Sequence, residues 1–283
     1  KMRQGEAMEK RNFIIPEFGP LAGLRVIGAG SLIAMPFAAT MMADFGAEVI
    51  QIERPKIGDT YRSFPPLKKT EQGTAGSSWM QDARNRLSMT LELDLNDPDV
   101  KEIFFRLIER SDIFIENMVW LDKLGIHDSE LLKINPRLVI VHVSGYGHKE
   151  FGGLPEICDQ ASYDMTSQAY SGYALFNGYP DRDPLIVKPS LGDYITALFA
   201  LFGMLSAHIS AKTRDAAGWS MFRSLKLRRA LCAMLLPCHR SASPRCSAAE
   251  RKTIGFQPWD LFTSRDGIYV SMARLAKACL SAL

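Results

Sequence analysis

The chain has 283 residues, of which 47% are hydrophobic and 23% charged, and its formal net charge is +3. This composition excludes disordered and fibrous proteins, and the length allows one large domain or two smaller ones. The longest apolar stretch, Ile195 to Leu205, is too short to span a bilayer, and residues 1 to 11 lack a signal-peptide core, so we expect a soluble, cytoplasmic protein that does not enter a membrane.

The first predicted elements form a βαβ unit. Leu24 to Ile27 is a short apolar run typical of a strand, and Leu32 to Phe45 has apolar residues at helical spacing. A second strand is predicted over Ala47 to Ile52. The Pro and Gly content of Pro55 to Gly76 predicts a long surface loop.

The alternation of strands and helices then continues. A strand over Ser88 to Leu93 is followed by a helix over Asp97 to Glu109 and a strand over Ile113 to Glu116. A short helix over Asp128 to Lys133 and a strand over Leu138 to Ser144 come next. The last strand is almost entirely apolar, which is typical of a strand buried on both faces. The predicted fold class is therefore α/β, with a Rossmann-like, doubly wound parallel sheet.

The second half of the chain is less regular. We expect a helix near Tyr163 to Tyr173, an apolar helix from Tyr194 to about Ser210, and a hairpin over Leu261 to Ser271 whose turn contains Asp266-Gly267. The predicted organisation is an N-terminal extension (1–18), a large domain (19–212), a linker (213–253) and a fragment of a smaller second domain (254–283).

The predicted linker differs in composition from the rest of the chain. Residues 216 to 252 are strongly basic, but they show no helical stripe and no interleaved aromatic residues, so no nucleic-acid partner is expected. The spacing of Cys232, Cys238, His239 and Cys246 fits no common zinc motif, so we expect free thiols and no metal.

Two patterns carry candidate chemistry near the predicted strands. Gly28 and Gly30 follow a strand as in a dinucleotide-binding loop, but Ile33 stands where the third glycine is needed, so a tight turn explains them better. Asp193 opens the apolar helix after Gly192. Asp193 is either a helix-start acid with Ser190 as cap, or a carboxylate that attacks a thioester carbonyl.

Four basic side chains lie near the ends of predicted strands or in loops: Arg62, Arg84, Arg86 and Lys123. Solvated surface is the ordinary explanation for such residues. A ligand with several phosphates would be a different explanation, because guanidinium groups bind phosphate oxygens strongly. The residues alone leave both explanations open.

A series of short motifs occurs in order along residues 19 to 212. They are Gly19 to Val26, Pro36 to Ala38, Asp44 to Ile50, Glu53 to Pro55, Gly58-Asp59 with Arg62, Arg84 to Arg86, Thr90 to Leu93, Asp112 to Asn117, Ser144 to Gly147, Tyr163-Asp164, Gln168-Ala169 and Gly192-Asp193. This series resembles the family III CoA-transferases, also called the CaiB/BaiF family. Phe18 to Gly23 and Ser171 to Tyr173 are most similar to the carnitine CoA-transferase branch.

The resemblance implies an enzyme that moves CoA from an acyl-CoA to a small carboxylic acid, with CoA thioesters as substrates and no permanently bound cofactor. It implies an interlocked homodimer and Asp193 as the nucleophile that forms an aspartyl-CoA thioester. It further implies that Arg62 and Arg86 contact the phosphates or adenine of CoA, that Lys123 replaces an arginine in this role, and that Tyr146 lines the thioester site.

Two alternatives accompany this interpretation. The α-methylacyl-CoA racemases of the same superfamily need a histidine before Asp164, where this chain has Tyr163, so transferase is favoured. The other alternative is a non-catalytic remnant, because residues 216 to 253 depart from the family pattern and the chain stops before its relatives do. We predict that 216 to 253 is translated between two compensating frameshifts.

Overall fold

The computed structural model contains two compact units, residues 1–164 with 190–228 and residues 165–189 with 229–283. The structure describes residues 12–71, 73–118, 120–149, 155–158, 160–171, 173–177 and 182–213, and three short strands further on. The cysteines and histidine considered as zinc ligands, and most of the predicted linker, lie outside the described residues. The predicted domain limits therefore stay predictions.

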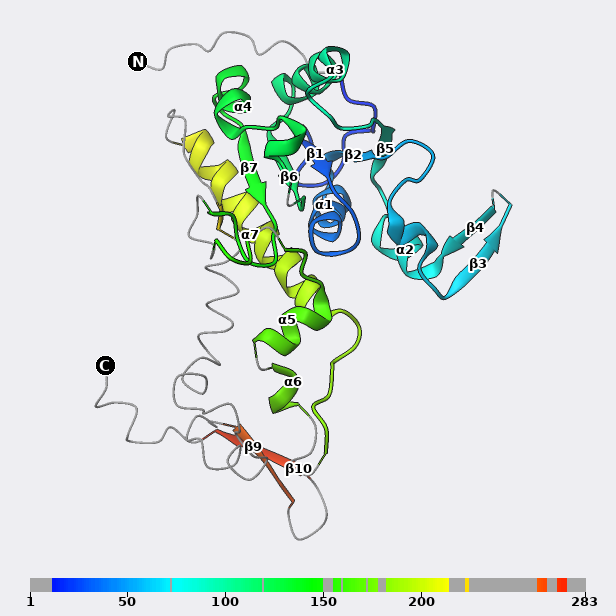
Figure 1. The fold of residues 1–283 in the computed structure, drawn as a ribbon, viewed down its shortest axis with the longest axis vertical. Coiled ribbons are helices and arrows are strands. Elements are labelled where there is room, and N and C mark those ends of the chain that lie inside the picture. Colours follow the sequence, from blue (N-terminus) through cyan, green and yellow to red (C-terminus); the bar gives the residue numbers. More distant parts are fainter. Residues whose placement is uncertain are drawn as a thin grey trace, which may run out of the picture. The chain divides into compact units, whose positions relative to one another are not determined.

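The first unit is built on a parallel sheet (Figure 1). Its strands are β1 (Arg25–Ala29), β2 (Glu48–Glu53), β5 (Leu87–Thr90), β6 (Ile113–Glu116), β7 (Val139–His142) and β8 (Phe222–Arg223). Their order is β5-β2-β1-β6-β7-β8, and every neighbouring pair is parallel. The predicted α/β, doubly wound sheet is confirmed. The short β8 lies inside the stretch predicted to be frameshifted.

Helices cover both faces of this sheet because alternate strand residues point to opposite sides. On one face, Val26 and Val141 pack with α1 (Ala34–Asp44) and α7 (Leu191–Thr213). On the other face, Ile27 and its alternating counterparts on β6 and β7 pack with α3 (Pro98–Glu109) and α4 (Asp128–Ile134). Strand β7 is buried along its full length, as predicted, and so is β6.

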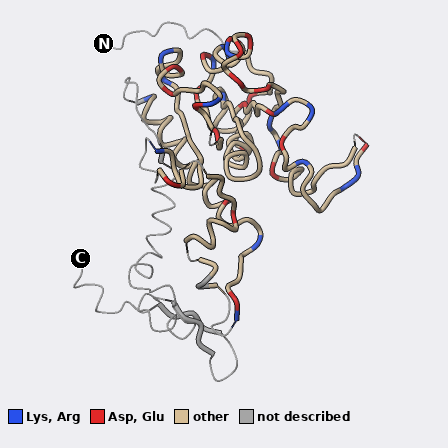
Figure 2. Tube along the Cα trace, viewed as in Figure 1, with Lys and Arg blue, Asp and Glu red and all other residues tan. Residues whose placement is uncertain are grey.

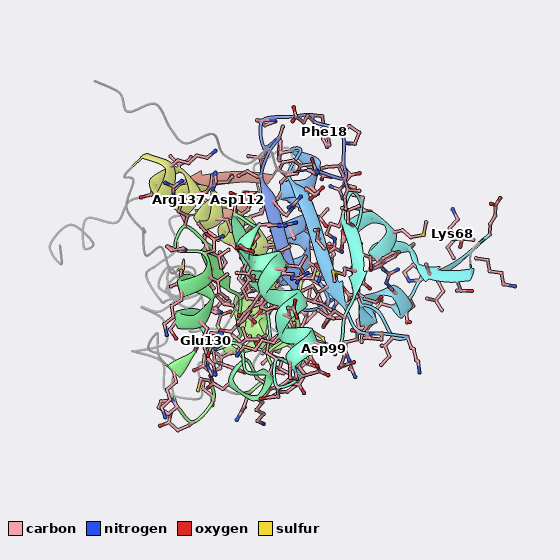
Figure 3. All side chains as sticks on the ribbon, turned by 90° about the horizontal axis from the view of Figure 1, so that it is seen from above. Phe18, Lys68, Asp99, Asp112, Glu130 and Arg137 are labelled. Carbon is pink, nitrogen blue, oxygen red and sulfur yellow. The ribbon has the colours of Figure 1, made fainter. Side chains whose placement is uncertain are left out.

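Helix α3 shows how the sequence specifies these elements. Asp97 is the N-cap and accepts hydrogen bonds from the backbone N–H groups of Asp99 and Val100, and proline occupies the first helical position. Phe104 and Ile108, one turn apart, are fully buried. Figure 3 shows the acidic side chains Asp99 and Glu130 on the outside of α3 and α4.

Helix α7 is longer than predicted, and by length and composition alone it could cross a membrane. Its acidic residue lies in the first turn and its basic residue in the last, and the helix between them is nearly free of charge (Figure 2). Ala197, Ala200, Met204 and Ala207 pack into the core against α1 and the sheet. These contacts account for one apolar face of α7, whereas Leu198, Phe202 and Ile209 on the same helix are exposed.

The segment predicted as a long loop over Pro55 to Gly76 contains secondary structure, so that prediction is wrong in part. It forms the 3-10 helix η1 (Thr60–Ser63) and the antiparallel hairpin β3 (Leu67–Thr70) and β4 (Gly73–Gly76), followed by α2 (Ser77–Asp82). The hairpin is almost fully exposed and has no alternating apolar face to reveal it in the sequence. Lys68 lies on this hairpin, at the edge of the molecule (Figure 3).

The helix predicted near Tyr163 to Tyr173 is two short helices, α5 (Asp164–Tyr170) and α6 (Tyr173–Phe176). Within the second unit, the side-chain oxygen of Gln168 accepts a hydrogen bond from Val187 N at 2.8 Å, and its side-chain nitrogen donates one to Val187 O at 3.0 Å. The predicted hairpin near the end of the chain is confirmed as the antiparallel strands β9 (Trp259–Thr263) and β10 (Tyr269–Ala273).

Candidate functional site

The carboxyl ends of the parallel strands form the edge at which α/β proteins bind ligands, near the point where the strand order reverses. Here that point lies between β1 and β6, because the chain leaves β1 toward β2 and later returns on the opposite side. Asn117, just after β6, accepts a hydrogen bond from Ser31 N at 3.0 Å and donates to Ser31 O at 2.8 Å. A Cβ at Gly30 would lie 1.8 Å from the Asn117 oxygen, so glycine is required there.

The loop after β1 is also held by Asp59. One carboxylate oxygen of Asp59 accepts hydrogen bonds from Leu32 N at 3.0 Å and Tyr61 N at 2.9 Å, and burial raises the pKa of this carboxyl group. Asp59 and Asn117 therefore occupy the N–H groups of Leu32 and Ser31. The loop does not offer these donors to a pyrophosphate, which favours the prediction that its glycines serve a tight turn.

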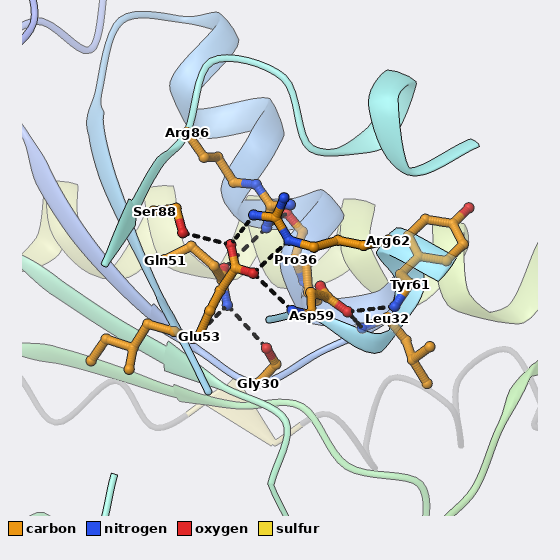
Figure 4. Close-up of polar contacts among 11 residues, drawn as sticks. Gly30, Leu32, Pro36, Gln51, Glu53, Asp59, Tyr61, Arg62, Arg86 and Ser88 are labelled. Carbon is orange, nitrogen blue, oxygen red and sulfur yellow. Dashed lines mark hydrogen bonds and ion pairs between the residues drawn. The ribbon is translucent and has the colours of Figure 1, made fainter. Parts of the chain in front are cut away.

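Arg62 and Arg86 meet around the carboxylate of Glu53, at the end of β2 (Figure 4). We call Glu53, Asp59, Arg62 and Arg86 the arginine cluster. Arg62 donates from Nε at 2.8 Å and from Nη2 at 2.7 Å to the two oxygens of Glu53. These oxygens also accept bonds from Ser88 Oγ (2.8 Å) and Asp59 N (2.7 Å). Burial raises the pKa of Glu53, but these bonds, led by that of Arg62, outweigh burial, so the pKa lies below its ordinary value.

Arg86 differs from Arg62 because its hydrogen-bond partners are neutral. Its Nη1 donates to the side-chain oxygen of Gln51 at 3.0 Å and to Pro36 O at 3.3 Å. Burial is the main cause that lowers the pKa of Arg86 to about 10, although the negative charges of Asp59 and Glu53 act to raise it. Among the described residues, its buried Nε has no hydrogen-bond partner. A buried guanidinium with an unused donor is suited to bind an anion.

The other two predicted contact residues lie on loops at the same edge. Lys123 is exposed in the 3-10 helix η2 (Asp122–Leu124), after β6, and its carbonyl accepts a bond from Asn96 at 3.1 Å. Tyr146 is half-buried in the loop after β7. The structure thus joins Arg62 and Arg86 in one cluster and places Lys123 and Tyr146 on separate loops.

Asp193 is half-buried in the first turn of α7. The predicted cap Ser190 takes part through its carbonyl, which accepts bonds from Asp193 N and Tyr194 N, both at 3.1 Å. The side-chain acceptor at this helix start is instead the buried Asp164, whose carboxylate bonds to Gly192 N at 2.7 Å. The motif marked Asp164, but nothing in the sequence indicated that it contacts α7.

A hydrogen-bonded network joins the start of α7 to η1. The buried carboxylate of Asp82 accepts a bond from Tyr194 Oη at 2.7 Å and one from Tyr61 Oη at 3.0 Å. Burial and this carboxylate raise the pKa of Tyr61 to about 12 and also raise the pKa of Tyr194. Tyr194 follows Asp193 and Tyr61 precedes Arg62, so Asp82 links the candidate nucleophile to the arginine cluster.

A second polar cluster lies at the ends of β6 and β7. We call Glu116, Asp128, His142 and His148 the histidine cluster. His142 Nδ1 lies 2.6 Å from a Glu116 oxygen, and its Nε2 lies 2.9 Å from an Asp128 oxygen. Burial lowers the pKa of His142, but Asp128 and Glu116 outweigh burial and raise the pKa to about 10. Sequence reasoning missed this cluster.

Comparisons with known proteins agree with the motif series. The bile acid CoA-transferase BaiK of Clostridium scindens is 43% identical over 196 residues, which cover 69% of this chain and 41% of that protein. The alpha subunit of succinyl-CoA–L-malate CoA-transferase from Chloroflexus aurantiacus is 31% identical over 264 residues, or 90% of this chain and 58% of that subunit.

A crystal structure of a CAIB/BAIF family protein from Brucella suis superposes with a TM-score of 0.69 at 26% identity, covering 89% of this chain and 65% of that one. The chain spans 41% to 58% of the length of the two curated relatives named above. The family model of CoA-transferase family III matches residues 21–283, which is nearly the whole chain. The chain belongs to CoA-transferase family III.

Proposed function

We propose that this chain transfers CoA from an acyl-CoA thioester to a carboxylic acid, with Asp193 as the covalent nucleophile. The position of Asp193 carries the proposal. It lies in the first turn of a 23-residue helix, where the helix dipole stabilises negative charge. The residues on either side of it are fixed, Gly192 by Asp164 and Tyr194 by Asp82.

The proposed reaction has four displacement steps. The Asp193 carboxylate attacks the thioester carbonyl and expels CoA thiolate, which leaves an acyl-aspartyl anhydride. The thiolate attacks the aspartyl carbonyl and releases the donor acid, leaving an aspartyl-CoA thioester. The incoming carboxylate expels the thiolate and forms a second anhydride. The thiolate then attacks the acyl carbonyl of the incoming acid, so that the new thioester leaves and the Asp193 carboxylate is restored.

The arginine cluster supplies the proposed recognition of CoA. Arg86 offers a buried donor that no described residue uses, and Arg62 is held rigidly by Glu53 and by the ring of Trp79, 4.0 Å from its guanidinium carbon. A rigid guanidinium loses little entropy when it binds phosphate. Lys123, which is exposed, would contact CoA phosphate from the loop after β6, and Tyr146 would line the thioester site.

The wider assignments are proposals of the same kind. CoA thioesters act as substrates, and the reaction needs no resident cofactor. We propose a homodimer, to be tested by light scattering, and a cytoplasmic location. The carnitine-like motifs and the acids in the relatives' names define a small panel of acceptors: carnitine, a bile acid, malate and succinate. Transfer to each, from acetyl-CoA and succinyl-CoA, would show which acid is used.

The nucleophile is tested by intact mass spectrometry of the purified chain after incubation with an acyl-CoA, with hydroxylamine added to trap the aspartyl thioester as a hydroxamate. We expect the adduct to map to Asp193 and to disappear in Asp193→Asn. Asp99→Asn is the matched control, because Asp99 also lies in the first turn of a helix. Equal absence of adduct in wild type and Asp193→Asn, across all donors, would instead support a non-catalytic chain.

A further inference from the structure

The histidine cluster contains the donor set of a transition-metal site. Glu116, His142 and His148 each offer one potential ligand atom, and these three atoms lie within 4.8 Å of one another. Glu116 is fully buried and His142 is 6% exposed, whereas the side chain of His148 is 21% exposed. Two imidazoles and one carboxylate are a common protein ligand set for zinc, with a fourth position left to water.

The separations in the cluster suit such an ion. A tetrahedral ion with bonds of about 2.0–2.1 Å holds neighbouring ligand atoms about 3.3 Å apart. The Glu116 oxygen lies 2.6 Å from His142 Nδ1 and 3.7 Å from His148 Nε2, so the observed distances bracket this value. The centroids of the two histidine rings are 5.0 Å apart.

The surroundings of His142 have the form found around metal-bound histidines. Such a histidine commonly donates its second ring N–H to a carboxylate, which fixes the orientation of the ring. His142 Nε2 lies 2.9 Å from Asp128, at the start of α4, while Nδ1 faces Glu116. The other Glu116 oxygen accepts a bond from Met118 N, which holds this carboxylate in place.

The backbone brings His148 back over the sheet. After β7, Ser144 Oγ accepts a bond from Gly147 N at 2.9 Å, and Gly147 has a positive φ of 83°. This turn returns the chain so that the His148 ring meets the His142 ring edge to face. The two histidines thus converge from a strand end and from the loop that follows it.

We propose that Glu116, His142 and His148 bind one Zn²⁺ ion, with Asp128 orienting His142. The ion replaces the proton between His142 Nδ1 and Glu116, so that binding releases this proton to solvent. An ion here would fix the loop between His142 and His148. The proposal does not depend on the CoA-transfer reaction.

The test is a Zn²⁺ titration of the full chain after dialysis against a chelator, in competition with a chromophoric zinc indicator. We expect one ion per chain for wild type and no one-site binding for His148→Ala. We expect about 10-fold weaker binding for Asp128→Asn, since removing such an orienting group typically costs about 10–100-fold. His127→Ala is the control, because His127 is half-exposed beside Asp122 and outside the cluster, and its affinity should equal wild type.

Cobalt distinguishes this site from binding by thiols. Co²⁺ in the proposed site gives a visible spectrum without the intense near-ultraviolet band of cobalt–thiolate bonds. Unchanged Zn²⁺ affinity in both His148→Ala and Asp128→Asn, a thiolate band, or no Zn²⁺ bound by folded wild type would each overturn the proposal. Circular dichroism of every variant checks that the fold is retained. Because His148 is the least buried of the three ligands, His148→Ala should disturb the fold least.

Discussion

The arginine cluster and the histidine cluster lie at the same edge of one parallel sheet, on opposite sides of its switch point, yet they suit ligands of opposite charge. Around β1, β2 and β5, a carboxylate holds the guanidinium group of Arg62, and Arg86, whose hydrogen-bond partners are neutral, keeps a donor that no described residue uses. Around β6 and β7, carboxylates hold imidazoles. The fold supplies the position, and the residues at and near the strand ends decide the charge of the ligand.

The largest expected effect is on the arginine cluster. Each carboxylate oxygen of Glu53 accepts two hydrogen bonds. Glu53→Gln therefore places an amide NH₂ group against hydrogen-bond donors, and it also removes the ion pair of Arg62. We expect a loss of about 2–3 kcal/mol in the free energy of unfolding, measured with urea.

Glu92→Gln is the control for this change. Glu92 pairs with Arg54 at 3.8 Å and both side chains are 65% exposed, so its loss should stay below about 0.5 kcal/mol. Equal stability of the two variants would show that the arginine cluster contributes no more than a surface ion pair.

The second prediction separates the two clusters by ligand. Arg86→Met should weaken CoA binding roughly 10–100-fold in calorimetric titrations, because a charge-assisted hydrogen bond to phosphate is lost. The variant should bind Zn²⁺ as wild type does, whereas His148→Ala should bind CoA as wild type does. Arg84→Met is the control, since Arg84 pairs with Asp44 at the surface. Wild-type CoA affinity in Arg86→Met would contradict the assigned role of Arg86.

The third prediction concerns the link between α7 and the arginine cluster. Tyr194→Phe removes the 2.7 Å hydrogen bond to Asp82 and should lower the free energy of unfolding by about 1 kcal/mol in urea titrations. Tyr163→Phe changes a tyrosine that is 58% exposed and should cost less than about 0.5 kcal/mol. If both variants lose the same amount, the Asp82 network does not anchor α7.

The smallest effect is a pH dependence. The pKa of Glu53 in the folded protein lies below its ordinary value of 4.5, so the folded state binds this proton less readily than the unfolded chain. Its contribution to stability is present above about pH 4.5 and is lost as the pH falls through the folded pKa. The stability gap between wild type and Glu53→Gln should therefore narrow on acidification below pH 4.5. If the difference in stability widened instead, the pKa of Glu53 would have to be raised, and not lowered, in the folded protein.

Much of the sheet could be predicted because apolar periodicity is strong where a strand or helix is buried. Strands β1, β2, β5, β6 and β7 and helices α1, α3, α4 and α7 all follow such patterns, with the ends of α3 marked by its Asp-Pro start. The exposed hairpin β3–β4 and the short helix α2 bury too little apolar surface to leave a pattern. For this reason the sequence did not predict the hairpin or α2.

The candidate site was predicted only in part. The motif series indicated Arg62, Arg86 and Asp193, and sequence order placed Glu53 and Asp59 near Arg62. The partner of Tyr194 could not be foreseen, because Asp82 lies 112 residues away along the chain and shows no distinguishing neighbour. The same holds for His142 and Glu116, which are 26 residues apart.

The sequence by itself determined the family, the parallel α/β sheet and the acidic residue at the start of α7, because these depend on local patterns and on motif order. Only the tertiary structure decided which side chains come together at the edge of the sheet where ligands bind. Parallel strands place their carboxyl ends side by side whatever their separation in the chain, so His142 at the end of β7 meets Glu116 at the end of β6. The pairing of β5 with β2 likewise brings Arg86, just before β5, to Gln51 on β2.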